Sequence, residues 1–87
     1  MSSWFVYIVK CSDNSLYTGI AVNVERRIKE HNENDLLSAK YTRMRRPVNL
    51  VYKEEQFTRS NAAKREYEIK QLSRIEKKAL VIEGLKA

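Results

Sequence analysis

The amino-acid sequence predicts a small α/β (α+β) domain: a three-stranded antiparallel sheet flanked by three helices, in the order β-β-α-β-α-α. Three observations support this prediction: short β-rich runs, helix-capping patterns between and after them, and a length of only 87 residues. A chain of this length buries about 60% of its extended surface and forms one modest core. We therefore expect a single domain that spans residues 1–87.

The first half of the chain predicts a hairpin and then a helix. Residues 4–11 (WFVYIVKC) are a continuous aromatic and β-branched run, which is typical of a strand buried on both faces. The turn residues SDNS lead into a second strand over residues 15–21. Asn23 is the expected N-cap of a helix that ends within residues 32–35 (NEND), where a polar loop begins.

A third strand is predicted after the polar loop. Pro47 blocks continuation of a helix and introduces residues 48–57 (VNLVYKEEQF). Alternation along this strand would place Val48, Leu50 and Tyr52 on one side of the sheet.

Two helices are predicted to complete the chain. The first covers roughly residues 59–72, and its candidate N-caps are Thr58, Ser60 and Asn61. Ser73 and Glu76 form a capping-box pattern, which predicts a break and a further helix over residues 74–83. Gly84 is the expected C-terminal stop of that helix. Its expected apolar stripe is Ile75, Ala79 and Ile82.

Composition narrows the class of protein. Hydrophobic residues make up 43% of the chain, which is enough for a folded globule. The single cysteine excludes an intramolecular disulfide and favours a reducing compartment. The longest apolar run, residues 4–9, is too short to span a bilayer, and the N-terminus lacks a signal-peptide pattern. We expect a soluble, cytoplasmic protein with no membrane partner.

Positive charge is concentrated in one segment. The chain carries 17 Lys and Arg against 11 Asp and Glu, a formal net charge of +6. Residues 40–46 (KYTRMRR) contain four cations and no acid, and these cations are Lys40, Arg43, Arg45 and Arg46. Such a segment on the surface would attract phosphate groups through counterion release. A solvated basic loop is an equally good interpretation from composition alone.

Most familiar catalytic motifs are missing from the sequence. It contains no Gly-rich phosphate loop, no pair of cysteines and no HExxH motif. One histidine and one cysteine do not make a zinc site, and no nucleophile-elbow pattern supports a Ser-His-Asp triad.

Glu66 occupies an unusual position in the first of the two C-terminal helices. It shares a helix face with Ala62 and Ile69, where a hydrophobic residue is expected. Burial of an ionised carboxylate costs several kcal/mol unless it is paired or binds a metal. Glu66 is therefore either an ion-pair partner of Arg65 or Lys70, or a ligand for a hard cation such as Mg²⁺ or Mn²⁺.

Two tyrosines and two helix residues form a second group of interest. Tyr7 and Tyr17 lie on the two strands of the predicted hairpin, where each is either a packing residue or half of a phenol pair. Arg27 and His31 are four residues apart and share a helix stripe. A phenol beside an arginine has a lowered pKa and can act as a general base.

Five segments in this order resemble the GIY-YIG nuclease domain. They are FVY at 5–7, YTG at 17–19, ERRIKEH at 25–31, KYTRMRRP at 40–47, and the A..RE..IK pattern at 62–70. The resemblance covers nearly the whole chain. It is strongest to the small, stand-alone bacterial proteins of this family.

The resemblance implies roles for five residues at the hairpin and the first helix. Tyr7 matches the last position of the first half-motif, and Tyr17 matches the first position of the second. Gly19 is the motif glycine, which fits a close backbone approach. Arg27 matches the arginine that contacts the scissile phosphate, and His31 matches a position often occupied by histidine or tyrosine.

The resemblance also implies a cofactor, a partner and a reaction. Glu66 matches the glutamate that holds one divalent cation, Mg²⁺ or Mn²⁺. The implied activity is metal-dependent hydrolysis of phosphodiester bonds in DNA, duplex or branched, by a monomer or weak dimer. Tyr7, with Tyr17 beside it, would take a proton from the attacking water, Arg27 would neutralise phosphate charge, and His31 would orient the water or the base. The nucleic-acid backbone would be held by Lys40, Arg43, Arg45 and Arg46.

Three positions depart from the family pattern. Phe5 replaces the leading glycine, Thr18 replaces a branched aliphatic residue, and Ile20 stands where some members have a lysine that assists the base. One alternative function is a non-catalytic nucleic-acid-binding module with the same fold, and another is a domain that binds an acidic protein. A buried carboxylate favours the enzyme, because binding alone does not require one.

Overall fold

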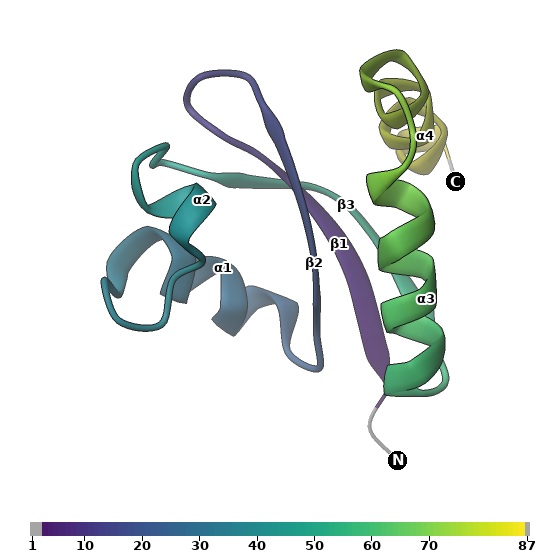
Figure 1. Ribbon diagram of the computed structural model, residues 1–87, viewed down its shortest axis with the longest axis horizontal. Helices are drawn as coiled ribbons and strands as arrows, with labels where there is room; N and C mark the ends of the chain where they lie inside the picture. Colours follow the sequence, from purple (N-terminus) through teal and green to yellow (C-terminus); the bar gives the residue numbers. More distant parts are fainter. Residues whose placement is uncertain (1–2, 87) are drawn as a thin grey trace.

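β1 is the central strand of the fold. The structure is a computed structural model that describes residues 3–86. Its elements, shown in Figure 1, are β1 (Trp4–Lys10), β2 (Leu16–Ala21), α1 (Val24–Glu33), α2 (Lys40–Arg43), β3 (Asn49–Gln56), α3 (Arg59–Lys70) and α4 (Arg74–Lys86). The predicted order β-β-α-β-α-α is confirmed for the longer elements. The short helix α2 is an addition, because it forms within the basic segment that was expected to be a loop.

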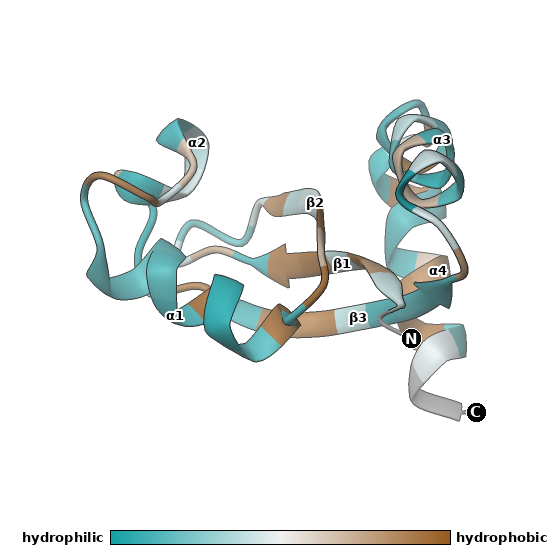
Figure 2. Ribbon diagram, turned by 90° about the horizontal axis from the view of Figure 1, so that it is seen from below, coloured by the Kyte–Doolittle hydropathy of each residue, from teal (hydrophilic) through white to brown (hydrophobic). Residues whose placement is uncertain are grey.

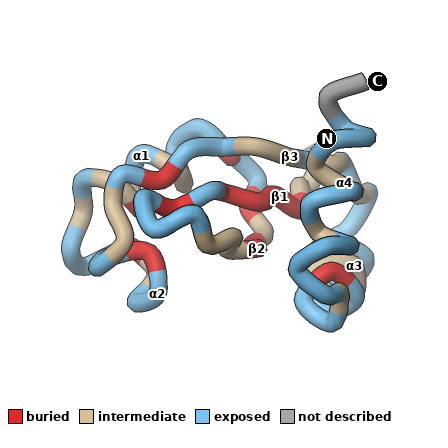
Figure 3. Tube along the Cα trace, turned by 90° about the horizontal axis from the view of Figure 1, so that it is seen from above, coloured by how far each residue is buried: buried red, intermediate tan, exposed pale blue. Residues whose placement is uncertain are grey.

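The sheet is antiparallel with the strand order β2-β1-β3. Its central strand carries the longest buried run, Val6 to Val9, as the apolar sequence predicted. Figure 3 shows this buried stretch of β1 between more exposed neighbours. β2 is an edge strand, and Tyr7 of β1 pairs with Gly19 of β2.

The two faces of β1 pack against different helices. Tyr7 and Val9 point into a cluster with Val24 of α1, and Val6 and Ile8 point into a cluster with α3 and α4. α1 and α2 accordingly lie to one side of the sheet, and α3 and α4 lie to the other (Figures 1 and 2). Among residues 3–86, no helix is both long and apolar enough to cross a membrane.

The predicted helix caps are confirmed where they depend on local sequence. The Asn23 side chain accepts a hydrogen bond from the Arg26 N–H at the start of α1, and Thr58 accepts one from the Asn61 N–H at the start of α3. At the start of α4, the Ser73 N–H donates to Glu76 and the Glu76 N–H donates back to Ser73, which completes the capping box.

The prediction that Val48, Leu50 and Tyr52 share one side of the sheet is wrong. Ile8 pairs with Tyr52 but Val9 pairs with Leu50, so one extra residue of β3 interrupts the register. This irregularity is typical of a β-bulge and breaks the alternation of side chains. Val48 consequently packs on the α1 side, Tyr52 packs on the α3–α4 side, and Leu50 is exposed.

The prediction for the buried face of α4 is also wrong. Ile75 and Ile82 are 81% and 54% exposed, whereas Leu80 and Val81 pack against the sheet. The helix also continues past Gly84, which was expected to end it. Gly84 lies against the ring of Tyr52, and a Cβ at this glycine would be 2.8 Å from Tyr52 Cδ1. The glycine therefore allows close packing of α4 on β3.

Candidate active site

The site begins at the cross-strand pair of Tyr7 and Gly19. The Tyr7 ring crosses over the backbone of β2, so that a Cβ at Gly19 would be 2.5 Å from Tyr7 Oη. Any larger residue at position 19 would displace the phenol. The glycine of the second half-motif thus has a packing role, which is to leave room for the tyrosine of the first.

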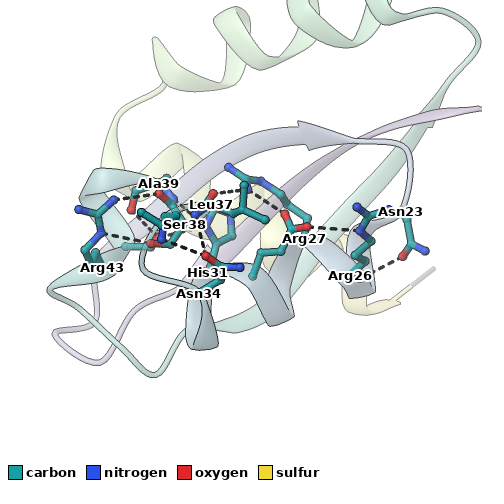
Figure 4. A network of polar contacts seen from close by, with 12 residues as sticks. Asn23, Arg26, Arg27, His31, Asn34, Leu37, Ser38, Ala39 and Arg43 are labelled. Atoms are coloured by element: carbon teal, nitrogen blue, oxygen red, sulfur yellow. Dashed lines mark hydrogen bonds and ion pairs between the residues drawn. The ribbon is translucent and has the colours of Figure 1, made fainter.

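His31 joins this pair from α1. The imidazole is fully buried, and its Nε2 lies 2.7 Å from Tyr7 Oη. Its Nδ1 accepts a hydrogen bond of 3.2 Å from the Ala39 N–H and lies 3.1 Å from Thr42 Oγ1 (Figure 4). The helix places His31 beneath the segment that leads into α2, and each ring nitrogen has a polar partner.

Tyr17 borders the same imidazole from β2. Its ring lies edge-on to His31, with 5.6 Å between the ring centroids and an angle of 75° between the planes. It also stacks on Tyr41 of α2 at 5.8 Å and 21°. The Arg45 guanidinium lies 3.9 Å from the centroid of Tyr41. Tyr17 is thus held between the imidazole and an aromatic residue of α2.

Arg27 lies one helical turn before His31. Its Nη1 donates to Glu30 Oε1 at 3.0 Å and to the Leu37 carbonyl at 2.6 Å (Figure 4). Its side chain is 28% exposed, against 76% for Arg26. Contacts therefore join Tyr7, Tyr17 and His31, and the charge of Arg27 acts on the Tyr7 phenol; the catalytic roles of these residues stay predictions.

Burial controls the protonation of the two buried groups. It raises the pKa of the Tyr7 phenol, with further increases from Tyr17 and Glu66, while the positive charge of Arg27 opposes the rise. Burial and, to a smaller extent, the positive charge of Arg27 together lower the pKa of His31 to about 4. At pH 7 the tyrosine is therefore protonated and the histidine is neutral.

Glu66 lies on α3, on the other side of the sheet from α1. Its side chain is 23% exposed and forms an ion pair of 3.4 Å with Lys70. Arg65, the other partner considered, instead pairs with Glu54 at 3.0 Å. Among residues 3–86, no hydrogen bond or ion pair joins the Glu66 carboxylate to the tyrosine cluster, and its charge is the smallest of the influences that raise the pKa of Tyr7.

The donor set fits a weakly held hard cation. No group of three or more His, Cys, Asp or Glu side chains gathers anywhere in residues 3–86. Mg²⁺ usually keeps several water ligands and is bound by one or two protein carboxylates together with substrate phosphates, so one carboxylate can supply the protein's share. Glu66 is the residue that would hold it.

The four cations of the basic segment differ in their surroundings. Lys40 is exposed on α2, and Arg43 is exposed with its guanidinium on Ser38. Arg45 donates to Asp13 and to the Tyr41 carbonyl. Arg46 turns inward, where it donates to the His31 carbonyl at 2.6 Å and to Asp35 at 2.8 Å.

Sequence reasoning missed three contributors to the site, all from the segment that contains α2. They are the Ala39 N–H, the fully buried Thr42 and the stacking residue Tyr41. Thr42 gives a weak sequence signal, because it is the only β-branched residue among residues 40–46. A backbone N–H gives none.

Comparison with known proteins shows which family the chain resembles. The family model for the GIY-YIG catalytic domain matches residues 3–79. The UPF0213 protein DP2720 of Desulfotalea psychrophila is 60% identical over 79 residues, which are 91% of this chain and 71% of that protein. The UPF0213 protein SSP2268 of Staphylococcus saprophyticus is 55% identical over 97% of this chain and 100% of its own length.

Two solved structures are similar to the fold. The solution NMR structure of the UPF0213 protein BH0048 from Bacillus halodurans is 43% identical, with a TM-score of 0.59 over 94% of this chain and 86% of that one. The solution NMR structure of EF2693 from E. faecalis is 42% identical, with a TM-score of 0.61 over 88% and 80% of the two chains.

Proposed function

Because this chain belongs to the GIY-YIG catalytic-domain family, a superfamily of nucleases, we propose that it is a metal-dependent endonuclease that hydrolyses phosphodiester bonds in DNA. One observation carries the proposal: the buried hydrogen bond of 2.7 Å between Tyr7 Oη and His31 Nε2, formed within reach of the Arg27 charge. A packing tyrosine does not require a buried imidazole partner and a neighbouring guanidinium. A phenol that must carry negative charge in a reaction does.

In this proposal the tyrosines take part in proton transfer, and Arg27 stabilises the charge of the phosphate. Tyr7, with Tyr17 beside it, first loses its own proton to solvent, and the resulting phenolate accepts the proton of the attacking water. Arg27 neutralises the charge that grows on the phosphate oxygens in the transition state, and its bonds to Glu30 and Leu37 hold the guanidinium in place. Its charge also opposes the rise of the Tyr7 pKa that burial causes.

Glu66 is the proposed ligand of one divalent cation, Mg²⁺ or Mn²⁺. When bound, this cation supplies Lewis-acid stabilisation of the leaving 3′ oxygen and offsets the carboxylate charge that raises the Tyr7 pKa. In the ion pair between Glu66 and Lys70, the lysine side chain is 48% exposed to solvent. Such a pair contributes little stability, so it is readily exchanged for a cation.

The basic segment is the proposed contact for the DNA backbone. Lys40 and Arg43 are exposed on α2, next to the turn that supports His31. Phosphate contacts of this kind hold the duplex without reading its sequence.

The decisive experiment is nicking of supercoiled plasmid with and without Mg²⁺ or Mn²⁺. We expect Glu66→Ala to abolish metal-dependent nicking while DNA binding largely survives, because the basic segment is untouched. Glu68→Ala is the matched control, since Glu68 lies on the same helix, is 53% exposed and pairs with Arg65. If Glu66→Ala still nicks the plasmid with the metal dependence of the wild type, Glu66 is not the metal ligand and has only a structural role.

A second candidate function is nucleic-acid binding without turnover. The raised pKa of Tyr7 favours it, because a protonated phenol is a poor base, and so does Ile20 at the position of the assisting lysine. Saturable DNA binding with no nicking in either cation would select this function over the enzyme.

A further inference from the structure

The hydrogen bonds around His31 admit two arrangements of protons. In the first, Nδ1 is unprotonated and accepts from the Ala39 N–H, and Nε2–H donates to Tyr7 Oη. In the second, Nδ1–H donates to Thr42 Oγ1, and Nε2 accepts the Tyr7 hydroxyl hydrogen. The distances of 2.7 Å and 3.1 Å at the two nitrogens suit both arrangements.

The Ala39 N–H distinguishes the two arrangements. A backbone N–H can only donate, and this one points at Nδ1 over 3.2 Å. A proton on Nδ1 would face the amide hydrogen and leave a part-buried donor without a partner. The hydroxyl of Thr42 has a single hydrogen, which it donates either to the Ala39 carbonyl at 2.9 Å or to Nδ1. In the first arrangement it donates to Nδ1, and the Ala39 carbonyl keeps the N–H groups of Thr42 and Arg43 as donors.

We propose that the Ala39 N–H holds His31, the only histidine of the chain, in its Nε2–H tautomer, so that His31 donates to Tyr7 and is a positioning residue rather than a proton acceptor. The catalytic meaning of this inference rests on the proposed function. The tautomer assignment itself does not depend on the proposed function.

The tautomer decides where the Tyr7 proton can go. With Nε2 already protonated, His31 has no site to receive it, so the hydroxyl hydrogen of the buried Tyr7 has no acceptor among residues 3–86. The proposed tautomer therefore requires this cost to be smaller than that of two N–H groups facing each other at Nδ1. The proton must therefore leave to an acceptor other than His31. The negative oxygen left behind would be stabilised by the His31 N–H and the Arg27 charge.

The direct test is ¹⁵N NMR of the imidazole at pH 7, where the neutral ring dominates. A single histidine gives one unambiguous pair of nitrogen signals in a long-range ¹H–¹⁵N spectrum. We expect a pyridine-like Nδ1 and a pyrrole-like Nε2. The opposite pattern, or averaged shifts that indicate equal populations, would overturn the inference.

Ala39→Pro removes the amide hydrogen with little other change. The backbone φ of Ala39 is −63°, the value that proline imposes, and the Ala39 carbonyl remains available to Thr42 and Arg43. We expect the shift of Nδ1 to move toward the pyrrole-like value, because the Nδ1–H tautomer no longer faces a donor.

Ala39→Ser is the matched control, since it keeps the amide hydrogen and should keep the wild-type spectrum. Unchanged shifts in the proline variant, or equal changes in both variants, would show that the amide does not select the tautomer. If the proline variant does not fold, the wild-type spectrum still decides. Failure of the plasmid assay would overturn the proposed function but leave this spectrum unaffected, so the two failures are distinguishable.

Discussion

Arg26 and Arg27 are neighbours in the sequence but occupy different environments on α1. The Arg26 side chain is 76% exposed and pairs with Glu30, whereas the Arg27 side chain is 28% exposed and bonds both Glu30 and the Leu37 carbonyl. A charge placed where the transition state becomes negative typically contributes on the order of 10² to 10³ in rate. We expect Arg27→Ala to lose that factor and Arg26→Ala to affect mainly binding.

Single-turnover nicking at saturating protein measures this difference, because defects in binding then do not contribute. Arg27→Lys should recover little of the rate, since lysine keeps the charge but lacks the planar guanidinium that can bond Glu30 and Leu37 through Nη1 and present its other N–H groups to a phosphate. Comparable losses in Arg26→Ala and Arg27→Ala would contradict the assignment.

Thr18 is a buried residue whose hydroxyl has no partner within residues 3–86. An unpaired buried hydroxyl costs about 1 kcal/mol or more, and valine has nearly the same shape. We expect Thr18→Val to raise the free energy of unfolding by about 1 kcal/mol. Urea unfolding at neutral pH measures it, and a decrease would mean that the hydroxyl is satisfied by bound water.

At the scale of elements, local patterns were predictable and non-local contacts were not. The caps at Asn23, Thr58 and Ser73 depend on residues three positions apart, so the sequence alone located the starts of α1, α3 and α4. The register shift between β1 and β3 depends on a pairing across some forty residues, and no pattern within β3 encodes it. The buried face of α4 likewise depends on how Gly84 packs against Tyr52.

The same distinction holds for the site. The i,i+4 spacing of Arg27 and His31 placed them on one stripe of a helix, and the hairpin placed the two tyrosines nearby. The support of His31 by Ala39 and Thr42 comes from a different segment. Composition marked that segment only as basic, so its contacts with His31 could not be predicted from the sequence.

The basic segment supports a prediction about salt dependence. If all four of its cations contacted duplex phosphates, their removal would flatten the slope of log affinity against log salt by roughly 3 to 4. Arg46 is engaged with the His31 carbonyl and Asp35, so we expect a loss of about 3, with Arg46 contributing least. Filter binding across a salt series with Lys40→Gln, Arg43→Gln, Arg45→Gln and Arg46→Gln, singly and combined, measures it. An unchanged slope in the combined variant would mean that DNA contacts another surface of the protein.

For the whole molecule, His31 links stability to pH. Its pKa falls from an ordinary value of 6.5 to about 4 on folding, so the unfolded chain binds more protons between these values and stability falls as pH falls. Between pH 7 and pH 5 this one group should lower the free energy of unfolding by about 2 kcal/mol. Urea unfolding at both pH values measures the change. His31→Gln should remove most of it, and an equal pH dependence in that variant would assign the effect to carboxylates.

α2 has limited apolar support: Tyr41 stacks on Tyr17, but neither of the two apolar clusters described for the sheet includes any residue of α2 itself. Segments held mainly by polar contacts open locally at a lower free energy than the whole domain unfolds. Each such opening would release Nδ1 of His31 from Ala39 and Thr42 while β1 and both clusters remained folded. If the proposed activity requires His31 to be held by Ala39 and Thr42, the competent fraction of molecules would be set by the local opening equilibrium of α2 and would fall below the fraction that is folded.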